Sequence, residues 1–413
     1  MKKLVLFYIS VRTIITAFYD VYPIPGFRAT ELIGAIFPII LLVYYFERHP
    51  PLSRSQKKIF LLISWALFSS LIVLLNFGVN AYVIFKQFFK LLNGFAVFIA
   101  FPLIFRNNRD VNLLINAFLI STIFPALQIT AQYLIGADFL GLKAHVSGDI
   151  TLYSGVYGNH GVFGIISWMG LLSIITKLGV NNKKNRLLYV SLFIFYLLVG
   201  FTTFSRTIMV LMLVILFGFI LLLVRSKKGG ILLLTICLVL LAVISPVAEV
   251  AYENIKKRSL SEIEILRGER DIIYGLHGRV GRWDSKLTVF LQEYSIFEQM
   301  IGTDLSIGPH GDYFSWLFSY GFIGLLLYLS FIISLLFYVK TRLKRVISVF
   351  HKYYGAAVFL GIIIWIIMAI STNPSFMPDF GYFVLGNSTV FLFITRKRYN
   401  NNSTVINKKN EIR

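Results

Sequence analysis

Two short motifs hold the residues of this sequence that are best suited to chemistry. The first is Gly278-Arg279-Val280-Gly281-Arg282-Trp283, and the second is Pro309-His310-Gly311-Asp312-Tyr313. Both lie in one long hydrophilic segment of an otherwise apolar chain. The guanidinium group of an arginine can bind two phosphate oxygens at once, in a bidentate arrangement. A histidine that is neutral near pH 7 is a good general base for a hydroxyl group. The two motifs therefore predict chemistry on an anionic substrate, on one side of a membrane.

The residues beside the histidine suggest how it would be held. Pro309 and Gly311 favour a tight turn around His310, and Asp312 and Tyr313 begin the next apolar run, where they could orient the imidazole ring. The alternative for His310 is a structural or solvated histidine at the start of a helix. Trp283 could stack on a sugar ring, or it could belong to the belt of aromatic residues at the membrane surface.

The elements that position these motifs are expected to be membrane-spanning helices. The chain has 413 residues, of which 57% are hydrophobic and 14% are charged, and its mean hydropathy is +0.75. A helix needs about 20 apolar residues to cross a bilayer. Runs of about that length predict an all-α polytopic membrane protein with about 12 transmembrane helices, at residues 4–20, 30–46, 59–76, 82–105, 111–135, 157–177, 187–203, 205–225, 229–247, 313–338, 353–372 and 378–395.

The basic residues indicate which side of the membrane each loop faces. Cytoplasmic loops are enriched in Lys and Arg. If the N-terminus is inside, the inside loops and both termini hold about 26 of the 40 basic residues. The chain then divides into transmembrane helices 1–9 (residues 1–247), an extracytoplasmic loop (248–312), transmembrane helices 10–12 (313–395) and a cytoplasmic tail (396–413). Within the loop, residues 250–270 read as helical, and residues 285–300 predict an amphipathic helix near the membrane surface, with apolar residues at Leu287, Phe290, Leu291 and Phe297.

The net charge of +21 therefore needs no nucleic-acid partner, because most of it belongs to the cytoplasmic loops. The single cysteine, Cys237, lies in an apolar run and reads as a packing residue. It allows no disulfide within the chain and no cysteine metal site. The sequence also shows no phosphate loop, no zinc-protease motif and no Asp-rich cation site, so neither a metal nor a cofactor is expected.

Charged residues inside the spans are costly, and each is a functional candidate by default. Lys86 and Lys90 lie four residues apart, on one face of the fourth span. Arg206 begins the eighth span, and Arg12 lies near the middle of the first. The alternative for these side chains is snorkelling toward the headgroups, which is easier for Lys86 and Arg206 than for Lys90 and Arg12. His160, at the start of another span, is a weaker candidate.

All but one of the stronger cationic candidates map to the outer half of the membrane or to the outer loop; Arg12 lies deeper. The sequence offers no comparable acidic cluster in the outer halves of the spans to neutralise them. Such a set suits a lipid-linked diphosphate at the outer leaflet. A transported anion would also fit, but cations should then continue through the membrane core, where only Arg12 is a candidate.

These residues resemble the O-antigen ligase/polymerase family of bacterial polysaccharide assembly. The matching pieces are Ser205-Arg206, Gly278-Arg279 with Trp283, His310 with Tyr313, Gly321-Phe322-Ile323-Gly324, and a stretch rich in Gly and Asn at residues 155–164. The resemblance covers about residues 155–336, and the earlier spans match only in topology. The family often has His-Asn where this chain has His310-Gly311. Arg282 is additional to the family's pattern.

The resemblance implies a metal-independent glycosyltransferase of the bacterial cytoplasmic (inner) membrane, with both termini cytoplasmic. It would move a glycan from undecaprenyl diphosphate to an acceptor hydroxyl at the outer face. His310 would be the base, Arg206 and Arg279 would stabilise the departing diphosphate, and Lys86 and Lys90 would hold it. The expected substrate-binding residues are Lys86, Lys90, Arg282, Trp283, Asp312 and Tyr313.

Several functions remain open within and beyond this resemblance. An O-antigen repeat-unit polymerase of lipopolysaccharide assembly is favoured, because the motifs are loose and polymerases diverge more. A ligase that acts on lipid A core, a transferase to protein, and a flippase for lipid-linked oligosaccharide are the alternatives. The expected partners are the undecaprenyl-linked oligosaccharide, membrane lipid and, for a polymerase, a protein that regulates chain length.

Overall fold

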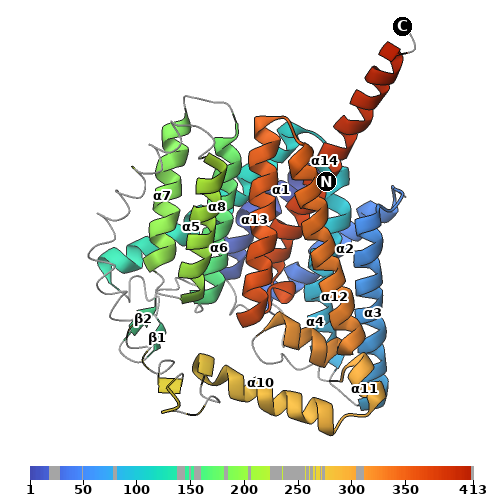
Figure 1. Ribbon diagram of the computed structural model, residues 1–413, viewed down its shortest axis with the longest axis vertical. Helices are drawn as coiled ribbons and strands as arrows, with labels where there is room; N and C mark the ends of the chain where they lie inside the picture. Colours follow the sequence, from blue (N-terminus) through green and yellow to red (C-terminus); the bar gives the residue numbers. More distant parts are fainter. Residues whose placement is uncertain are drawn as a thin grey trace.

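The computed structural model describes residues 1–17, 28–48, 50–77, 81–136, 145–147, 150–152, 160–180, 185–202, 206–223, 275–303 and 311–410, together with single residues and short pieces between 235 and 271. Within these residues the regular structure is helical except for one antiparallel ribbon of two short strands, β1 (His145–Ser147) and β2 (Ile150–Leu152). Figure 1 shows the helices standing side by side as one bundle.

The first part of the chain forms eight described helices close to the predicted spans. They are α1 (Lys2–Ala17), α2 (Ala29–Phe46), α3 (Arg54–Phe77), α4 (Ala81–Ile104), α5 (Asn108–Ile135), α6 (His160–Leu178), α7 (Arg186–Thr202) and α8 (Arg206–Leu223). The ninth predicted span, residues 229–247, lies outside the described residues, and so does most of the predicted helix at 250–270.

The last part of the chain forms α12 (Asp312–Arg345), α13 (Val349–Ser371), a short 3₁₀ turn η5 (Pro374–Phe376) and α14 (Pro378–Asn410). Five described helices are long and apolar enough to cross a membrane, namely α3, α4, α5, α12 and α13, and four shorter helices are also apolar. The protein is therefore an all-helical, multi-pass membrane protein, as the hydropathy pattern predicted.

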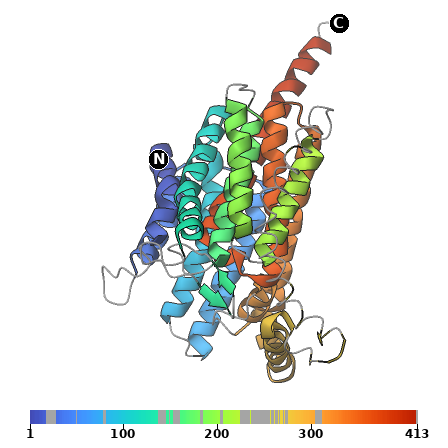
Figure 2. The same cartoon turned by 90° about the vertical axis from the view of Figure 1, so that its left-hand side faces the viewer.

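Polar contacts gather the basic turns at one end of the bundle. Lys2 forms an ion pair with Asp110 at 2.6 Å, and His351 lies 2.8 Å from the side-chain oxygen of Asn108. Lys177 donates to Asn112 over 2.5 Å. These contacts join the N-terminus to the turns before α5 and α13 and to the end of α6. Figures 1 and 2 show both chain termini toward this end and α10 and α11 at the opposite end.

The hydrophilic segment contributes two described helices, α10 (Gly275–Gln292) and α11 (Ile296–Ile301). A single amphipathic helix over residues 285–300 was predicted; the structure corrects its bounds, because the chain breaks at Glu293–Ser295 and Ser295 caps α11 through its side chain. α10 lies across the end of the bundle (Figure 1).

The apolar residues of this segment divide between two environments. Phe290 is 1% exposed and, with Leu287, packs in a small cluster with residues of α12. Leu291 and Phe297 are 51% and 59% exposed. The predicted apolar face is thus partly used for docking on α12, and its remainder faces outward.

A kink in α12 lets the end of α11 dock by backbone contact. Gly321 has φ +68°, a conformation that side chains disfavour, and a Cβ atom there would lie 2.2 Å from the carbonyl oxygen of Met300. Gly302, with φ +80°, meets the backbone of Ser319 and Tyr320 in the same way. Ser69 of α3 donates to the Ile301 carbonyl over 2.6 Å. These contacts fix one end of the hydrophilic segment on the bundle.

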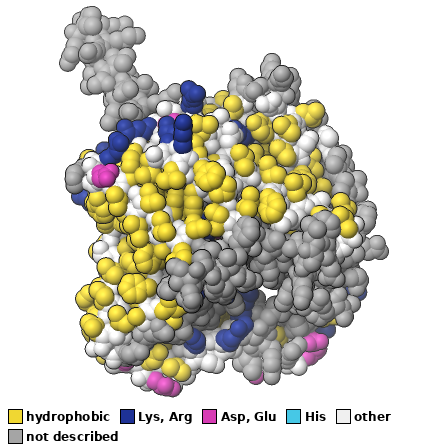
Figure 3. Space-filling model, turned by 180° about the vertical axis from the view of Figure 1, so that it is seen from behind, with side chains coloured by type: hydrophobic (Ala, Val, Ile, Leu, Met, Phe, Trp, Pro, Cys, Tyr) yellow, Lys and Arg dark blue, Asp and Glu magenta, His cyan; other side chains and the backbone are white. Residues whose placement is uncertain are grey.

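The surface agrees with a membrane-embedded bundle. In Figure 3 hydrophobic side chains cover a broad central band of one face, and a group of Lys and Arg side chains lies above this band. Large apolar side chains of several helices are more than half exposed, among them Phe7, Leu75, Leu134, Phe217 and Leu326. Such exposure is costly in water and ordinary in a bilayer.

Candidate functional site

A cavity of about 620 Å³ lies among α1, α2, α4, α6 and the start of α14. Its walls are mostly apolar, and five charged side chains line it: Arg12, Glu31, Lys86, Lys90 and Asp379. Arg12 lies in the second half of α1, Glu31 in the first turn of α2, Lys86 and Lys90 in the second and third turns of α4, and Asp379 at the start of α14. Because these helices alternate in direction, all five lie toward the end of the bundle that carries α10 and α11.

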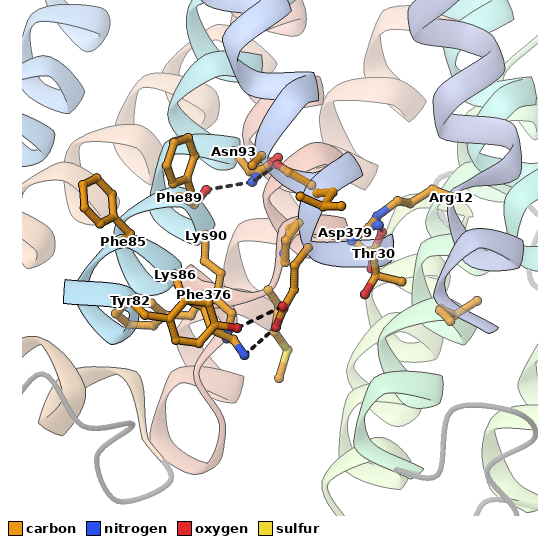
Figure 4. A pocket seen from close by; sticks show the side chains of 17 residues that line it. Arg12, Thr30, Tyr82, Phe85, Lys86, Phe89, Lys90, Asn93, Phe376 and Asp379 are labelled. Atoms are coloured by element: carbon orange, nitrogen blue, oxygen red, sulfur yellow. Dashed lines mark hydrogen bonds and ion pairs between the residues drawn. The ribbon is translucent and has the colours of Figure 1, made fainter. Parts of the chain in front are cut away.

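The two lysines that the sequence placed on one helix face do share this cavity (Figure 4). Lys86 forms an ion pair with Glu31, its ammonium nitrogen 2.5 Å from Oε1 of the carboxylate. Lys90 is half-buried one turn further along α4, and within the described part of the chain it makes no hydrogen bond or ion pair. An ammonium group in such a position attracts an anion, because burial without a counter-ion is costly.

Arg12 reaches the same cavity from the opposite wall. Its guanidinium Nε lies 3.0 Å from Oδ1 of Asp379, and Arg12 as a whole is 8% exposed. The structure thereby corrects one expectation. The outer halves of the spans were predicted to hold no acidic groups that neutralise the cations, but Glu31 and Asp379 neutralise Lys86 and Arg12.

The deep end of the cavity is closed by polar groups that satisfy one another. Asn93 donates to the backbone carbonyls of Gly34 and Phe89, over 2.9 Å and 2.7 Å, and it accepts from the hydroxyl of Tyr382. Asn93 is therefore committed to joining α4 with α2 and α14. Among the cations of the lining, Lys90 is the one without a hydrogen bond or ion pair in the described part of the chain, and Lys86 lies one turn away from it on the same helix.

The cavity reaches the outside of the bundle at the first turns of α4. Phe85 lines the cavity and is 58% exposed, and Tyr82 lines it and is 37% exposed. At a surface that faces lipid, this opening would admit an apolar chain from the side while its polar head stays beside the lysines. Figure 4 shows Phe85 and Phe89 along one wall and Lys86 and Lys90 beside them.

Asp312, which was predicted to bind substrate, is fully buried in a network of its own. Its Oδ2 accepts hydrogen bonds from the Tyr328 hydroxyl at 2.5 Å, from the backbone and side chain of Ser375 at 3.1 Å and 2.5 Å, and from Trp365 at 3.4 Å. The side chain does not line the cavity. Tyr313 donates to the carbonyl of Ile366 over 2.9 Å and is also absent from the lining.

The Asp312 network connects the second motif to the cavity. Gly311 donates from its backbone to Asn373 over 2.9 Å, and the backbone nitrogen of Asp312 donates to Thr372 over 2.9 Å. These bonds and those to Ser375 hold the link between α13 and α14. The next residues of that link, Phe376 to Asp379, form one wall of the cavity. Asp312 therefore holds the segment that leads into this wall, although its own side chain does not line the cavity.

The first motif lies on α10, against the start of α12. The indole ring of Trp283 stacks on Phe314, with centroids 4.9 Å apart and an angle of 21° between the planes. This contact packs the first motif against the residue that directly follows the second motif. Arg279 is half-buried, and Arg282 is exposed. Burial lowers the pKa of Arg279, and the positive charge of Arg282 lowers it further. Neither arginine lines the cavity.

Three predicted residues lie wholly or partly outside the described part of the chain. His310 lies outside the described residues, and Arg206 and His160 begin α8 and α6 with side chains that are not described. Within the described part of the chain, no three His, Cys, Asp or Glu side chains gather in a group able to hold a metal ion.

Sequence reasoning missed Glu31 and Asp379, although a signal was present. Each lies within the first turn of a span that starts from the same side of the membrane as Lys86. Counting acidic residues in the first turns of spans would have found both. Which cation each one faces depends on how the helices pack, and the pairs join residues 55 and 367 positions apart in the chain.

No protein-family model matches the sequence, and no curated protein matches it. Among solved structures, the fold is similar to a chain of a peptidoglycan synthase complex, in a study of how polymerization and crosslinking are coordinated. The TM-score is 0.43 and the identity 15%, and the match covers 82% of this chain and 97% of that one. A likeness at this level carries no functional argument.

Proposed function

We propose that this protein is a membrane glycosyltransferase that takes its glycan from a polyprenyl diphosphate, and that it is a polysaccharide repeat-unit polymerase. The observation that carries the proposal is the cavity that combines apolar walls, a side opening at Phe85 and the ammonium groups of Lys86 and Lys90. A phosphate head and a hydrocarbon chain need these two environments side by side.

The size and position of the cavity support a lipid-linked substrate. Its volume of about 620 Å³ lies within the roughly 300–1,000 Å³ of ordinary small-molecule sites. It lies toward one end of the bundle, beside α10, whereas a transporter site is expected near the middle of the membrane. The basic turns at the opposite end favour a cytoplasmic location for that end, which would place the cavity in the outer half of a bacterial inner membrane.

The chemistry would be a single displacement at the anomeric carbon. The acceptor hydroxyl loses its proton to His310 and attacks the carbon, the bond from that carbon to the diphosphate oxygen breaks, and the lipid diphosphate leaves. Lys86 and Lys90 hold the diphosphate, while Arg279 and Arg206 stabilise the negative charge that develops on it. The proposal includes no metal ion, since fixed cations take that role.

The test is elongation by the purified full-length protein in lipid nanodiscs, with a lipid-diphosphate-linked repeat unit, excess EDTA and no nucleotide. We expect polymer to form, and we expect His310→Ala and Arg279→Ala to abolish it while both variants insert and accumulate normally. Lys57→Met, an exposed change at the opposite end of the bundle, is the control and should retain full activity.

Other outcomes would point to the other functions. Activity that disappears with EDTA and returns with magnesium would refute a mechanism based on fixed cations. A normal ladder of chain lengths from His310→Ala would refute the general-base role. Movement of the lipid-linked glycan across the membrane without a new glycosidic bond would identify a flippase, and transfer only to lipid A core would identify a ligase.

A further inference from the structure

The Glu31–Lys86 pair places a carboxylate where an anionic head group would bind. Glu31 lines the same cavity as Lys86 and Lys90, and its Oε1 is 2.5 Å from the Lys86 ammonium group. A diphosphate bound between the two lysines must therefore compete with Glu31 for Lys86. The carboxylate also repels any anion that Lys90 attracts, because both carry negative charge.

Glu31 is held more firmly than Lys86. Its second oxygen, Oε2, accepts a hydrogen bond from the Tyr82 hydroxyl at 3.0 Å and another from the backbone nitrogen of Arg28 at 3.2 Å. The latter belongs to the capping box of α2. Lys86 has no such backbone bond within the described part of the chain: its ammonium group lies 5.6 Å from the centre of the Tyr82 ring, on a flexible four-carbon side chain that is 31% exposed. When an anion arrives, the ammonium group moves and the carboxylate stays.

The net charge of the cavity lining affects the donor and the product of the reaction differently. Three cationic and two acidic side chains line it, so the lining carries one net positive charge. In transfer from a lipid diphosphate, the donor is a diphosphate diester and the product is a diphosphate monoester, which has one more ionisable oxygen. Without Glu31 the lining would carry two net positive charges, and its preference for the more anionic product over the donor would increase.

We infer that Glu31 is the residue that weakens binding of the departing lipid diphosphate and so allows the product to leave. This inference rests on the proposed function. Glu31 acts on Lys86 from a fixed position and need not touch the reacting carbon. It is a positioning and release residue, distinct from the base and from the cations that stabilise the leaving group.

The test compares Glu31→Gln with the wild type. Glutamine keeps an oxygen for Tyr82 and for the capping box, and it removes only the charge. In the full-length protein in detergent with EDTA, farnesyl diphosphate should bind Glu31→Gln on the order of fivefold more tightly, the effect of a partly exposed ion pair. In the elongation assay KM and kcat should both fall, and added farnesyl diphosphate should inhibit more strongly.

Two controls separate this effect from a general change of charge. Glu47→Gln removes an exposed carboxylate at the other end of the same helix and should change neither binding nor turnover. In a Lys86→Met background, Glu31→Gln should tighten binding much less, because the competition for Lys86 is gone.

The outcomes distinguish this inference from the proposed function. If the wild type binds farnesyl diphosphate and Glu31→Gln binds it equally or more weakly, the inference is wrong and the proposed function stands. If Glu31→Gln lowers kcat while KM and inhibition stay unchanged, Glu31 acts in catalysis and the inference is also wrong. If the wild type binds no lipid diphosphate, both proposals fail.

Discussion

At the scale of single residues, the cavity is defined by which cations already have a partner. Lys86 faces Glu31 and Arg12 faces Asp379, while Lys90 has no ion pair within the described chain. When no ligand is bound, these two ion pairs neutralise Lys86 and Arg12, and this lowers the energy of the empty cavity because a buried charge without a partner is costly. Lys90 is then the group whose environment improves most when an anion binds.

Replacing Lys90 by methionine tests whether the lysine without an ion pair is the one that binds the anionic group. Lys90→Met should lower elongation roughly 100-fold, judged by the loss of about 2.7 kcal/mol or more for one fixed donor to a developing anion. It should not destabilise the fold, since an apolar side chain of similar length replaces an unpaired ammonium group. The measurements are turnover in nanodiscs and thermal unfolding in detergent, with Lys57→Met as the matched control. Full activity in Lys90→Met would remove Lys90 from the site.

At the scale of elements, the hydrophilic segment is attached to the bundle at two places. Trp283 of α10 stacks on Phe314 of α12, and the end of α11 meets the kink of α12 at Gly321. Behind this surface, Asp312 joins the start of α12 to Ser375 and so to the wall of the cavity. The segment with the sequence motifs and the cavity with the lysines are thus connected through α12 and the link between α13 and α14.

The kink at Gly321 gives a test of this attachment. Gly321→Ala adds a Cβ atom 2.2 Å from the Met300 carbonyl oxygen at a residue with φ +68°, so the end of α11 must move away. We expect a loss of stability of about 1–3 kcal/mol from the backbone conformation alone, and faster proteolysis between α10 and α11. The matched control is Gly34→Ala, where a Cβ atom meets nothing within 4 Å. Equal melting temperatures for the two variants would show that the close contact is not required.

At the scale of the whole molecule, the arrangement predicts a membrane topology. The termini and the basic turns share one end of the bundle, and α10 and α11 lie at the other (Figures 1 and 2). The enrichment of basic residues in cytoplasmic loops favours a cytoplasmic location for the first end. The second end, with the cavity opening near it, would then face the periplasm or the cell exterior.

Cysteine labelling decides this topology. In a Cys237→Ala background, Ile296→Cys and Ile347→Cys introduce single thiols at positions that are 81% and 86% exposed, at opposite ends of the bundle. An impermeant maleimide should label Ile296→Cys in intact spheroplasts and Ile347→Cys only after lysis. The reverse pattern would invert the topology and place the cavity on the cytoplasmic side, against the proposed reaction.

The sequence by itself determined the spanning helices and the grouping of their ends. Apolar runs predicted the starts of α1 to α8 and α12 to α14 within about five residues, because a bilayer requires a continuous apolar helix of nearly fixed length. The ends of α12 and α14 were predicted too early, at residues 338 and 395, because these helices continue to Arg345 and Asn410 with polar residues that no longer carry a hydropathy signal. The spacing of Lys86 and Lys90 also placed them correctly on one face of α4, since that depends only on helix geometry.

The tertiary structure alone decided what those lysines face. The pairs Glu31–Lys86 and Arg12–Asp379 join different helices, and the depth and rotation of each helix, which no local pattern encodes, bring the charges within reach. The same holds for Asp312, which the sequence placed at a substrate and the structure buries among Tyr328, Trp365 and Ser375. A carboxylate at the start of a helix can meet substrate or hold a neighbouring segment, and only the packing around it distinguishes the two.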